Sequence, residues 1–353
     1  MLENYIQQLA AGQSLTEGQV VQAVEWLATE SIPPAEKARL LTALAQKGET
    51  PEEIAAFALA LREMSIHPPI DAFWRGSREI LDIVGTGGDR LGTFNISTTS
   101  AILCAAAGVT VAKHGNRAVT SKSGSADVLV ALGIPIDLTP AAAAQSLREK
   151  NFAFFFAPNF HPAFQHIGPA RKLCAERGQR TIVNVLGPLL NPAQPSAMLM
   201  GVARAELCEP LAHVLQAMGI RRGMVVTGRV PAGGPGERDQ AIDELSTLGN
   251  NTVAEFYHER GFTASGLSPQ EFPLQPAVLA DLLGGDAAAN AEITRRILHG
   301  VERGPQRDAV LLNAGAGLFV AGAAKSLAQG WELAGETIDS GKAGAKLEEL
   351  AAG

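Results

Sequence analysis

The sequence has little cysteine, no long hydrophobic run and no excess of positive charge. Its three cysteines, Cys104, Cys174 and Cys208, lie far apart and form no C-x-x-C pair. That spacing favours buried, reduced thiols in a reducing compartment. No apolar run reaches the roughly 20 residues needed to cross a bilayer.

Two further absences narrow the class of protein. The N-terminal stretch MLENYIQQLAAG lacks the basic segment followed by an apolar one that marks a signal peptide. The 29 basic residues are outnumbered by 36 acidic ones, and the net charge of −7 argues against a nucleic-acid surface. We therefore expect a cytoplasmic protein. Local charge, and not the total, decides whether it binds an anionic small substrate.

What is present is a chain of 353 residues, 46% apolar, whose pattern changes near residue 80. Before residue 70 the pattern is helical, and Thr50-Pro51-Glu52-Glu53 forms a capping box ahead of an apolar stripe. Afterwards short β-branched runs alternate with helical patterns. We predict an α/β fold with a mainly parallel central sheet flanked by helices and a smaller all-helical N-terminal lobe. The predicted strands are residues 80–84, 109–112, 134–136, 152–156, 198–202, 224–227 and 252–256.

Two glycine- and hydroxyl-rich turns follow the first two predicted strands. The first reads GTGGDRLGTFNISTTS from Gly85, and the second reads KHGNRAVTSKSGSAD from Lys113. A turn between the carboxyl end of a strand and a helix N-terminus is where α/β folds bind anions. Neither turn matches G-x-G-x-x-G or a P-loop, and one such turn alone is usually an ordinary connection. Two turns of like composition indicate a large phosphorylated ligand.

These motifs also carry a family resemblance. GTGGD, FNIST and KHGNR-x-x-x-SKSGSAD together resemble anthranilate phosphoribosyltransferases, as do RTIVNVLGPLLNPA and Asp243-Glu244-Leu245-Ser246 downstream. The resemblance covers nearly the whole chain. It implies transfer of a phosphoribosyl group from phosphoribosyl pyrophosphate to anthranilate in tryptophan biosynthesis.

The resemblance also implies an organisation of the chain. A helical lobe would span 1–72, joined by parts of 168–192, and an α/β domain that binds phosphoribosyl pyrophosphate would span 73–353. A hinge between them would let the site close over substrate and exclude water. The family further suggests a homodimer formed through the helical lobe.

The resemblance assigns phosphoribosyl pyrophosphate to both turns. The residues implied are Gly85, Gly88, Asp89, Thr93, Asn95, Ile96, Ser97, Thr98, Lys113, His114, Gly115, Asn116, Arg117, Ala118, Val119, Thr120, Ser121 and Ser125. Asp89 is unusual at an anion site, and we expect it to bind ribose hydroxyls or metal-bound water. The transfer requires no protein nucleophile, so we assign no catalytic nucleophile. The protein must hold the pyrophosphate, neutralise its growing charge and place the amine.

Adjacent carboxylates at Asp243 and Glu244 suit a divalent metal. Two acidic neighbours in a loop are usually just solvated, but they match the family's acidic pair. The resemblance adds the hydroxyl of Ser97 as a further ligand. We therefore expect Mg²⁺, which prefers oxygen ligands, waters and substrate phosphates.

For anthranilate the resemblance implies contacts with Gly85, Asn116 and Arg171. We add His114, which sits within the second turn. A planar guanidinium at position 171 can hold a benzoate carboxylate bidentately, although a surface helix arginine is the simpler interpretation. Gly187-Pro188 would form an apolar wall for the ring.

One segment departs from the family pattern. Residues 228–242 form a Gly/Pro-rich insertion before the acidic pair, which reads as a mobile surface loop. Thr227 stands where the family usually has a histidine.

Two alternatives remain open at this stage. A pyrimidine nucleoside phosphorylase would share the architecture but needs a different phosphate-loop sequence from KHGNR. A non-catalytic nucleic-acid-binding relative would be expected to lose GTGGD and the acidic pair, and both are present in this acidic chain.

Overall fold

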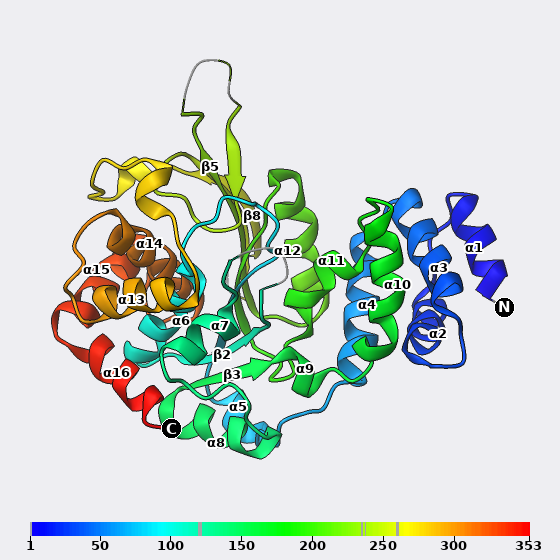
Figure 1. Cartoon of the computed structure of the whole chain (residues 1–353), viewed down its shortest axis with the longest axis horizontal. Helices are drawn as coiled ribbons and strands as arrows, with labels where there is room; N and C mark the ends of the chain where they lie inside the picture. The colour runs from blue at the N-terminus through cyan, green and yellow to red at the C-terminus, as the bar shows by residue number, and fades with distance from the viewer. Residues whose placement is uncertain (1, 119–121, 234–235, 237, 259–260) are drawn as a thin grey trace.

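The structure is a computed structural model that describes residues 2–118, 122–233, 236, 238–258 and 261–353 (Figure 1). Its first helices are α1 (Leu2–Ala10), α2 (Glu17–Ala28), α3 (Pro34–Lys47) and α4 (Pro51–Glu63). The predicted capping box is confirmed, because Thr50 Oγ1 accepts the Glu53 amide at 3.2 Å while the Glu53 carboxylate accepts the Thr50 amide at 3.0 Å. The apolar stripes of these helices pack against one another, with Val20, Val24 and Leu44 fully buried.

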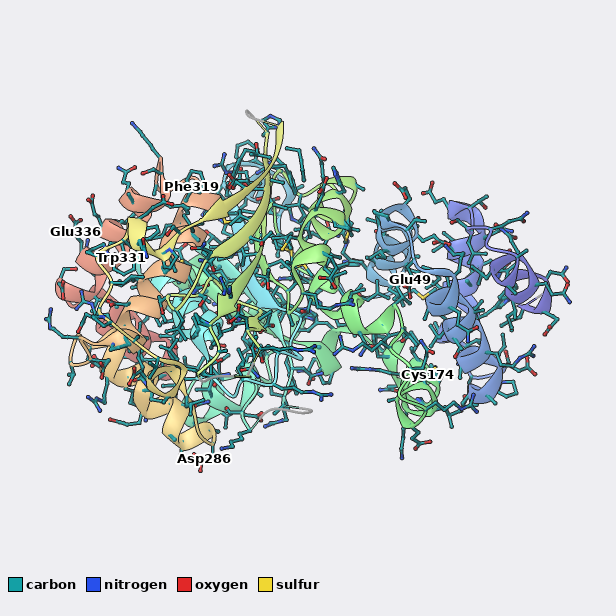
Figure 2. The ribbon with its side chains drawn as sticks, turned by 90° about the horizontal axis from the view of Figure 1, so that it is seen from above. Glu49, Cys174, Asp286, Phe319, Trp331 and Glu336 are labelled. Atoms are coloured by element: carbon teal, nitrogen blue, oxygen red, sulfur yellow. The ribbon has the colours of Figure 1, made fainter. Side chains whose placement is uncertain are left out.

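A helix from much later in the chain joins these four. Helix α10 (Phe164–Glu176) packs against α3, and its Cys174 Sγ lies 3.7 Å from the Ala38 carbonyl oxygen. The buried Lys37 Nζ donates to the carbonyls of Thr29 and His166, which ties α10 to α2 and α3. Figure 2 shows this helical cluster (α1–α4 and α10), marked by Cys174, on the opposite side of the molecule from Phe319, Trp331 and Glu336.

The sheet lies between these two sides. It has eight strands in the order β3-β2-β1-β4-β5-β7-β8, with β6 paired to β5 outside this path. The five strands from β3 to β5 are parallel, while β6, β7 and β8 run antiparallel to their neighbours. The predicted class, a mainly parallel sheet with helices on both faces, is confirmed. The strands are β1 (Ile80–Gly85), β2 (Thr110–Gly115), β3 (Phe152–Phe156), β4 (Ala197–Gly201), β5 (Arg222–Val230), β6 (Gln240–Ile242), β7 (Asn251–Tyr257) and β8 (Gly261–Leu267).

One predicted strand is wrong. Residues 134–136 form no strand, although Ile134 and Ile136 are both buried in the core. Their apolar side chains belong to the connection between two helices. In the sequence, a short β-branched run of this kind cannot be distinguished from a strand. Strands β6 and β8 were not predicted. Strand β8 reads Gly-Phe-Thr-Ala-Ser-Gly-Leu and is mostly exposed at the sheet edge, so it lacks the apolar signal.

Alternate residues of each strand face opposite layers, as the pleat requires. Leu81 and Ile83 of β1 pack in one core with α6 and α14, whereas Met198 and Met200 of β4 pack in the other with α12 and the helical cluster. Helix α14 is buried from Arg307 to Val320 and touches α15 through Gly315 and Gly330. The longer helices after α4 are α6 (Ile96–Ala106), α8 (Pro140–Lys150), α12 (Cys208–Ala217), α13 (Ala287–Leu298), α14 (Pro305–Val320), α15 (Leu327–Asp339) and α16 (Lys342–Ala351). Shorter helices are α5 (Ala72–Gly76), α7 (Ser125–Ala131), α9 (Ala157–Phe160), α11 (Val183–Leu186) and the 3₁₀ turns η1 (Gly187–Leu190), η2 (Ala205–Leu207), η3 (Pro269–Glu271) and η4 (Leu279–Leu282).

The carboxyl ends of the five parallel strands meet at one edge, which is where α/β sheets bind ligands.

Within the ranges described, no helix combines the length and apolar character needed to cross a bilayer.

Candidate functional site

The first predicted turn begins where β1 ends and is built for close contact with a second segment. A Cβ on Gly85 would overlap the carboxylate of Asp243, and one on Gly201, at the end of β4, would overlap the Asp243 carbonyl oxygen. Only glycine at both positions lets the acidic pair lie directly on the strand ends. Gly87 and Gly88 have φ of 70° and 89°, in the left-handed region that favours glycine.

Hydrogen bonds attach the acidic pair to this turn and to the following helix. The Gly87 amide donates to Asp243 Oδ2 at 2.6 Å, and the Ser97 amide at the start of α6 donates to Glu244 Oε1 at 3.2 Å. Asp89 also faces Asp243. The structure thus brings together Gly85, Ser97, Asp243 and Glu244, which the sequence separates by more than a hundred residues.

Both carboxylates of the acidic pair have raised pKa values. Burial and then the charge of Asp89 raise the pKa of Asp243 to about 7. Burial and then the charge of Asp243 raise the pKa of Glu244 to about 8. A bound cation would offset both effects, because it favours the charged carboxylates.

The segment that carries the pair is anchored on both sides. Thr227 Oγ1 donates to the Ile242 carbonyl at 3.3 Å, just before Asp243. Just after the pair, the Leu245 amide donates to Asn313 Oδ1 of α14 at 2.9 Å. Thr227 therefore holds the segment in place.

Residues 228–230 and 240–242, at the base of the expected insertion, form a hairpin. Strands β5 and β6 pair from Gly228 opposite Ile242 to Val230 opposite Gln240, and Arg229 forms a 2.5 Å ion pair with Asp239. This hairpin arm (the described residues of 228–242) projects away from the sheet, as Figure 1 shows at β5. Its base is thus strand-paired, and the prediction of a loop is wrong there.

Lys113 takes a buried position beneath the acidic pair. The side chain is 2% exposed, and its ammonium donates to the Ile83 carbonyl at 2.7 Å. Burial lowers its pKa, opposed by the charges of Asp82 and Glu244. Asp82 is fully buried beside it and bonds to Asn191 Nδ2 at 2.8 Å. Asp82, held by Asn191, therefore offsets the charge of the lysine, and the sequence singled out neither residue.

The second predicted turn folds back on itself. Ser125 Oγ donates to the Asn116 carbonyl at 3.3 Å, and Asp127 accepts from the amides of Ala118 and Gly124. Arg117 pairs with Asp127 at 3.0 Å and is largely exposed. A Cβ on Gly115 would overlap Ser125 Oγ, so the two ends of the turn touch. The predicted contacts Val119, Thr120 and Ser121 lie outside the described residues.

Asn95 links the two turns. Its amide donates to the Ser123 carbonyl at 3.3 Å, and its Oδ1 accepts from Asn290 at 2.8 Å. Thr98 is buried, and its hydroxyl has no hydrogen-bond partner among the described residues. The side chain of Ile96 packs in the core, and its amide already donates to the Phe94 carbonyl. Thr93 lies at an isolated bridge to Leu283.

The groups predicted for the aromatic substrate lie on the other side of the second turn. His114 is 5% exposed and makes a backbone hydrogen bond to Gly187, the residue before Pro188. His161, which the sequence gave no role, places its Nε2 at 3.0 Å from His114 Nε2. Burial and then the neighbouring His161 lower the pKa of His114 well below its ordinary range, so this ring is neutral.

Two arginines to be considered for the site, Arg171 and Arg180, lie in the segment after His161. Arg171 is exposed on α10, and among the described residues no hydrogen bond or ion pair joins it to either turn. Arg180 places a guanidinium nitrogen 3.7 Å from the position that a Cβ on Gly88 would take. Sequence reasoning passed over Arg180 as one cation in a basic stretch. Position along the chain does not reveal which of these cations reaches the glycine turn.

The chain is similar in sequence to known proteins over nearly its whole length. Residues 77–344 match the model for the glycosyl transferase family, a/b domain, and residues 3–65 match that for its helical bundle domain. An anthranilate phosphoribosyltransferase of Lacticaseibacillus paracasei is 44% identical over 352 residues, covering 100% of this chain and 97% of its own length. The same enzyme of Petrotoga mobilis is 44% identical over 350 residues, covering 99% and 96%.

Solved structures similar to this chain carry the same enzyme name as these relatives. The crystal structure of the anthranilate phosphoribosyltransferase from Thermus thermophilus has a TM-score of 0.86 and 42% identity, with 99% of this chain and 98% of that one covered. The Saccharomyces cerevisiae enzyme in complex with phosphoribosyl pyrophosphate and Mg has a TM-score of 0.83 and 27% identity, with 99% and 97% covered.

Proposed function

We propose how individual residues act from one premise: the chain belongs to the anthranilate phosphoribosyltransferase family. It is a pentosyltransferase of tryptophan biosynthesis that transfers the phosphoribosyl group of phosphoribosyl pyrophosphate to anthranilate. The products are N-(5-phosphoribosyl)anthranilate and pyrophosphate. The observation that supports the placement of the reaction is the acidic pair bonded to the glycine turn and to the Ser97 amide.

The reaction makes limited demands on protein groups. The bond between C1 and the pyrophosphate oxygen breaks, the bond between C1 and the amine nitrogen forms, and the amine loses a proton. Positive charge develops on the ribose ring and negative charge on the leaving pyrophosphate. The protein therefore acts by positioning and by stabilising charge.

The two turns bind the phosphoribosyl pyrophosphate in this proposal. The amides of Gly87, Ile96 and Ser97 already donate within the protein. The backbone amides of the first turn and of the α6 N-terminus that remain free face the phosphates, because free amides at such termini stabilise anions. Asn95 keeps the first turn in register with the second through Ser123. Lys113 contributes positive charge from beneath, because its ammonium is already committed to Ile83. The remaining turn residues predicted from the sequence keep that assignment.

The residues present fit Mg²⁺. Asp243 and Glu244 are oxygen donors whose pKa values are raised by burial and then by a neighbouring carboxylate, Asp89 for Asp243 and Asp243 for Glu244. The Ser97 hydroxyl lies on the helix that bonds Glu244. These three residues would hold the ion, with Asp89 beside Asp243 placed for ribose hydroxyls or metal-bound water. When bound, Mg²⁺ neutralises charge on the pyrophosphate. The hydrogen bonds of the acidic pair orient its carboxylates.

Anthranilate would lie against Gly85, His114, Asn116, Gly187 and Pro188. Arg171 would hold its carboxylate, which an exposed guanidinium without an ion-pair partner in the described ranges is free to do. The neutral His114 adds no positive charge near the attacking amine.

Three features of organisation are proposals. The helical lobe comprises 1–72 with parts of 168–192, and the rest of 73–353 forms the phosphoribosyl pyrophosphate domain; the packing of α10 on α3 supports this division. A homodimer forms through this lobe. The enzyme works in the cytoplasm, where its biosynthetic substrates occur.

The alternative functions are not favoured. The relatives found over the full length are anthranilate phosphoribosyltransferases, and both GTGGD and the acidic pair are present. Neither a nucleoside phosphorylase nor a nucleic-acid-binding relative explains all of these.

The direct experiment is turnover by purified protein with anthranilate, phosphoribosyl pyrophosphate and Mg²⁺. We expect pyrophosphate and phosphoribosylanthranilate in equal amounts, and loss of turnover when the metal is chelated. Absence of product with all three present would reject the function. Phosphorolysis of thymidine or uridine would favour the nucleoside phosphorylase instead.

A further inference from the structure

Three buried polar side chains from three separate segments meet behind the second turn. Ser65 follows α4, His161 follows α9 and His114 lies on β2, with exposed fractions of 7%, 7% and 5%. Ser65 Oγ lies 2.8 Å from His161 Nδ1, and His161 Nε2 lies 3.0 Å from His114 Nε2. The backbone of Gly187 also lies against the His114 ring. We call these four residues the histidine relay.

The Ser65 hydroxyl has a single hydrogen and lies 3.2 Å from the Leu61 carbonyl and 2.8 Å from His161 Nδ1. Whichever of these two atoms receives that hydrogen, the neutral rings of His161 and His114 stay bonded to one another, with hydrogen on only one of their two Nε2 atoms. Burial lowers the pKa of His161 to about 4.

The histidine relay joins parts of the molecule that belong to different layers. Ser65 lies at the end of α4 in the helical cluster, whereas His114 closes a central strand of the sheet. Gly187 begins η1, the proposed wall for the aromatic ring.

We propose that Ser65 and His161 are positioning residues that hold the His114 ring and the Gly187-Pro188 wall in register for the incoming aromatic amine. The inference rests on the proposed placement of anthranilate against His114, Gly187 and Pro188. Ser65 and His161 act through His114 and make no contact with the reacting atoms. Their effect is felt in the acceptor site because a misplacement of about 1 Å can slow a transfer roughly a hundredfold.

Asparagine and glutamine at position 161 separate the two bonds of the ring. The amide of His161→Gln reaches the place of Nε2 and still forms a hydrogen bond with His114, whereas that of His161→Asn reaches only the place of Nδ1. We expect His161→Asn to raise the KM for anthranilate about tenfold, as loss of one buried hydrogen bond allows. His161→Gln should raise it at most about threefold, and Ser65→Ala about threefold to fivefold. The KM for phosphoribosyl pyrophosphate should stay within about twofold of wild type in all three.

His213→Gln is the matched control, because His213 is an exposed histidine on α12 stacked on Phe262. It should leave both KM values unchanged. Equal losses in His161→Asn and His161→Gln, or a parallel rise in both KM values, would overturn the positioning role.

Nitrogen-15 NMR of the imidazole rings tests the histidine relay without substrate. In the wild-type protein we expect hydrogen on only one of the two Nε2 atoms of His114 and His161, and we expect a shift of the His161 signals in Ser65→Ala. Hydrogen on both Nε2 atoms or on neither, or unshifted His161 signals in Ser65→Ala, would overturn the proposal even if His161→Asn does not fold. The expected signals in a protein that does not turn over anthranilate would instead reject the proposed function, and the positioning role with it.

Discussion

Gly85 lacks a side chain at the one place where the carboxylate of Asp243 needs the space. The same is true of Gly201 and the Asp243 carbonyl. The sequence alone suggests that glycines in the first turn serve a ligand directly. The structure adds a second role for Gly85, which is to admit the acidic segment.

Gly85→Ala should therefore displace Asp243 and lower kcat/KM for phosphoribosyl pyrophosphate about a hundredfold, or roughly 2.7 kcal/mol. Gly18→Ala on α2 is the control, because no atom lies within 4 Å of its Cβ position. Steady-state kinetics at several Mg²⁺ concentrations measure both. Wild-type kinetics in Gly85→Ala would show that the acidic pair does not need this contact.

Arg171→Ala should raise the KM for anthranilate about tenfold or more, because it removes a charged hydrogen bond to the carboxylate. The KM for the phosphoribosyl donor should be nearly unchanged. Lys172→Ala, the exposed neighbouring cation, provides the comparison. An equal effect of Arg171→Ala on both substrates would assign the arginine another role.

His161 makes stability depend on pH. Burial and then His67 lower its pKa to about 4 from an ordinary value near 6.5, so the unfolded chain binds the proton first as pH falls. Stability is therefore full above pH 6.5 and declines between about 6.5 and 4, by roughly 3 kcal/mol from this group. Chemical denaturation from pH 7 to 4.5 should show a shallower decline in His161→Gln than in wild type. Parallel curves would mean that His161 takes up its proton normally.

Sequence reasoning found the residues whose neighbours are close in the chain. The turns could be predicted because glycine, hydroxyl and basic residues follow each strand directly. His161 and Asn313 could not, because their partners His114 and Leu245 lie 47 and 68 residues away. Nothing local distinguishes a histidine that meets another histidine from one that merely packs.

Among the elements, helix α4 shows how one side chain can hold several segments together. Glu53 caps its own helix, accepts the Leu15 amide at 2.9 Å and pairs with Lys47 at 2.6 Å. Both partners of this ion pair are almost fully buried. The capping box was visible in the sequence, whereas the contacts to Leu15 and Lys47 depend on how α2 and α3 pack.

Glu53→Ala should destabilise the protein by about 3 kcal/mol or more, because it leaves a buried ammonium without its partner. Glu52→Ala, the neighbouring acidic residue in the same helical turn, should change stability by less than about 1 kcal/mol. Urea unfolding followed by circular dichroism compares the two. Similar losses for both variants would contradict the special role of Glu53.

The strands were predictable where both faces are buried. Strands β1 to β4 are buried along nearly their whole length, and β3 and β4 are continuous apolar runs, which is typical of parallel strands covered by helices. Strand β8 escapes prediction because it is an exposed edge held mainly by its backbone pairing with β7. Residues 134–136 mislead for the opposite reason, since their isoleucines are buried without being in a strand.

For the whole molecule, the sheet order places residues from distant segments at one edge. The acidic pair follows β6, yet it lies on the ends of β1 and β4. Strand order could not be predicted, because it depends on which helices cover which face. The parallel class itself could be predicted, since strands and helices alternate along the chain.

Mg²⁺ with phosphoribosyl pyrophosphate should raise the thermal midpoint of the wild-type protein, because ligand at 100 times its Kd stabilises by about 2.7 kcal/mol. Asp243→Asn should abolish most of this rise. Asp239→Asn, in the hairpin arm and paired with Arg229, should preserve it. An undiminished rise in Asp243→Asn would remove Asp243 from the metal site.

The two-sided anchoring of the acidic segment has a practical consequence for the hairpin arm. Thr227 fastens Ile242 at the base of the arm, and Asn313 fastens Leu245 beyond the carboxylates. A fluorescent label or an affinity peptide inserted into the arm beyond these two hydrogen bonds should therefore leave the acidic pair in place. The arm is accordingly a suitable attachment point for immobilising the active enzyme.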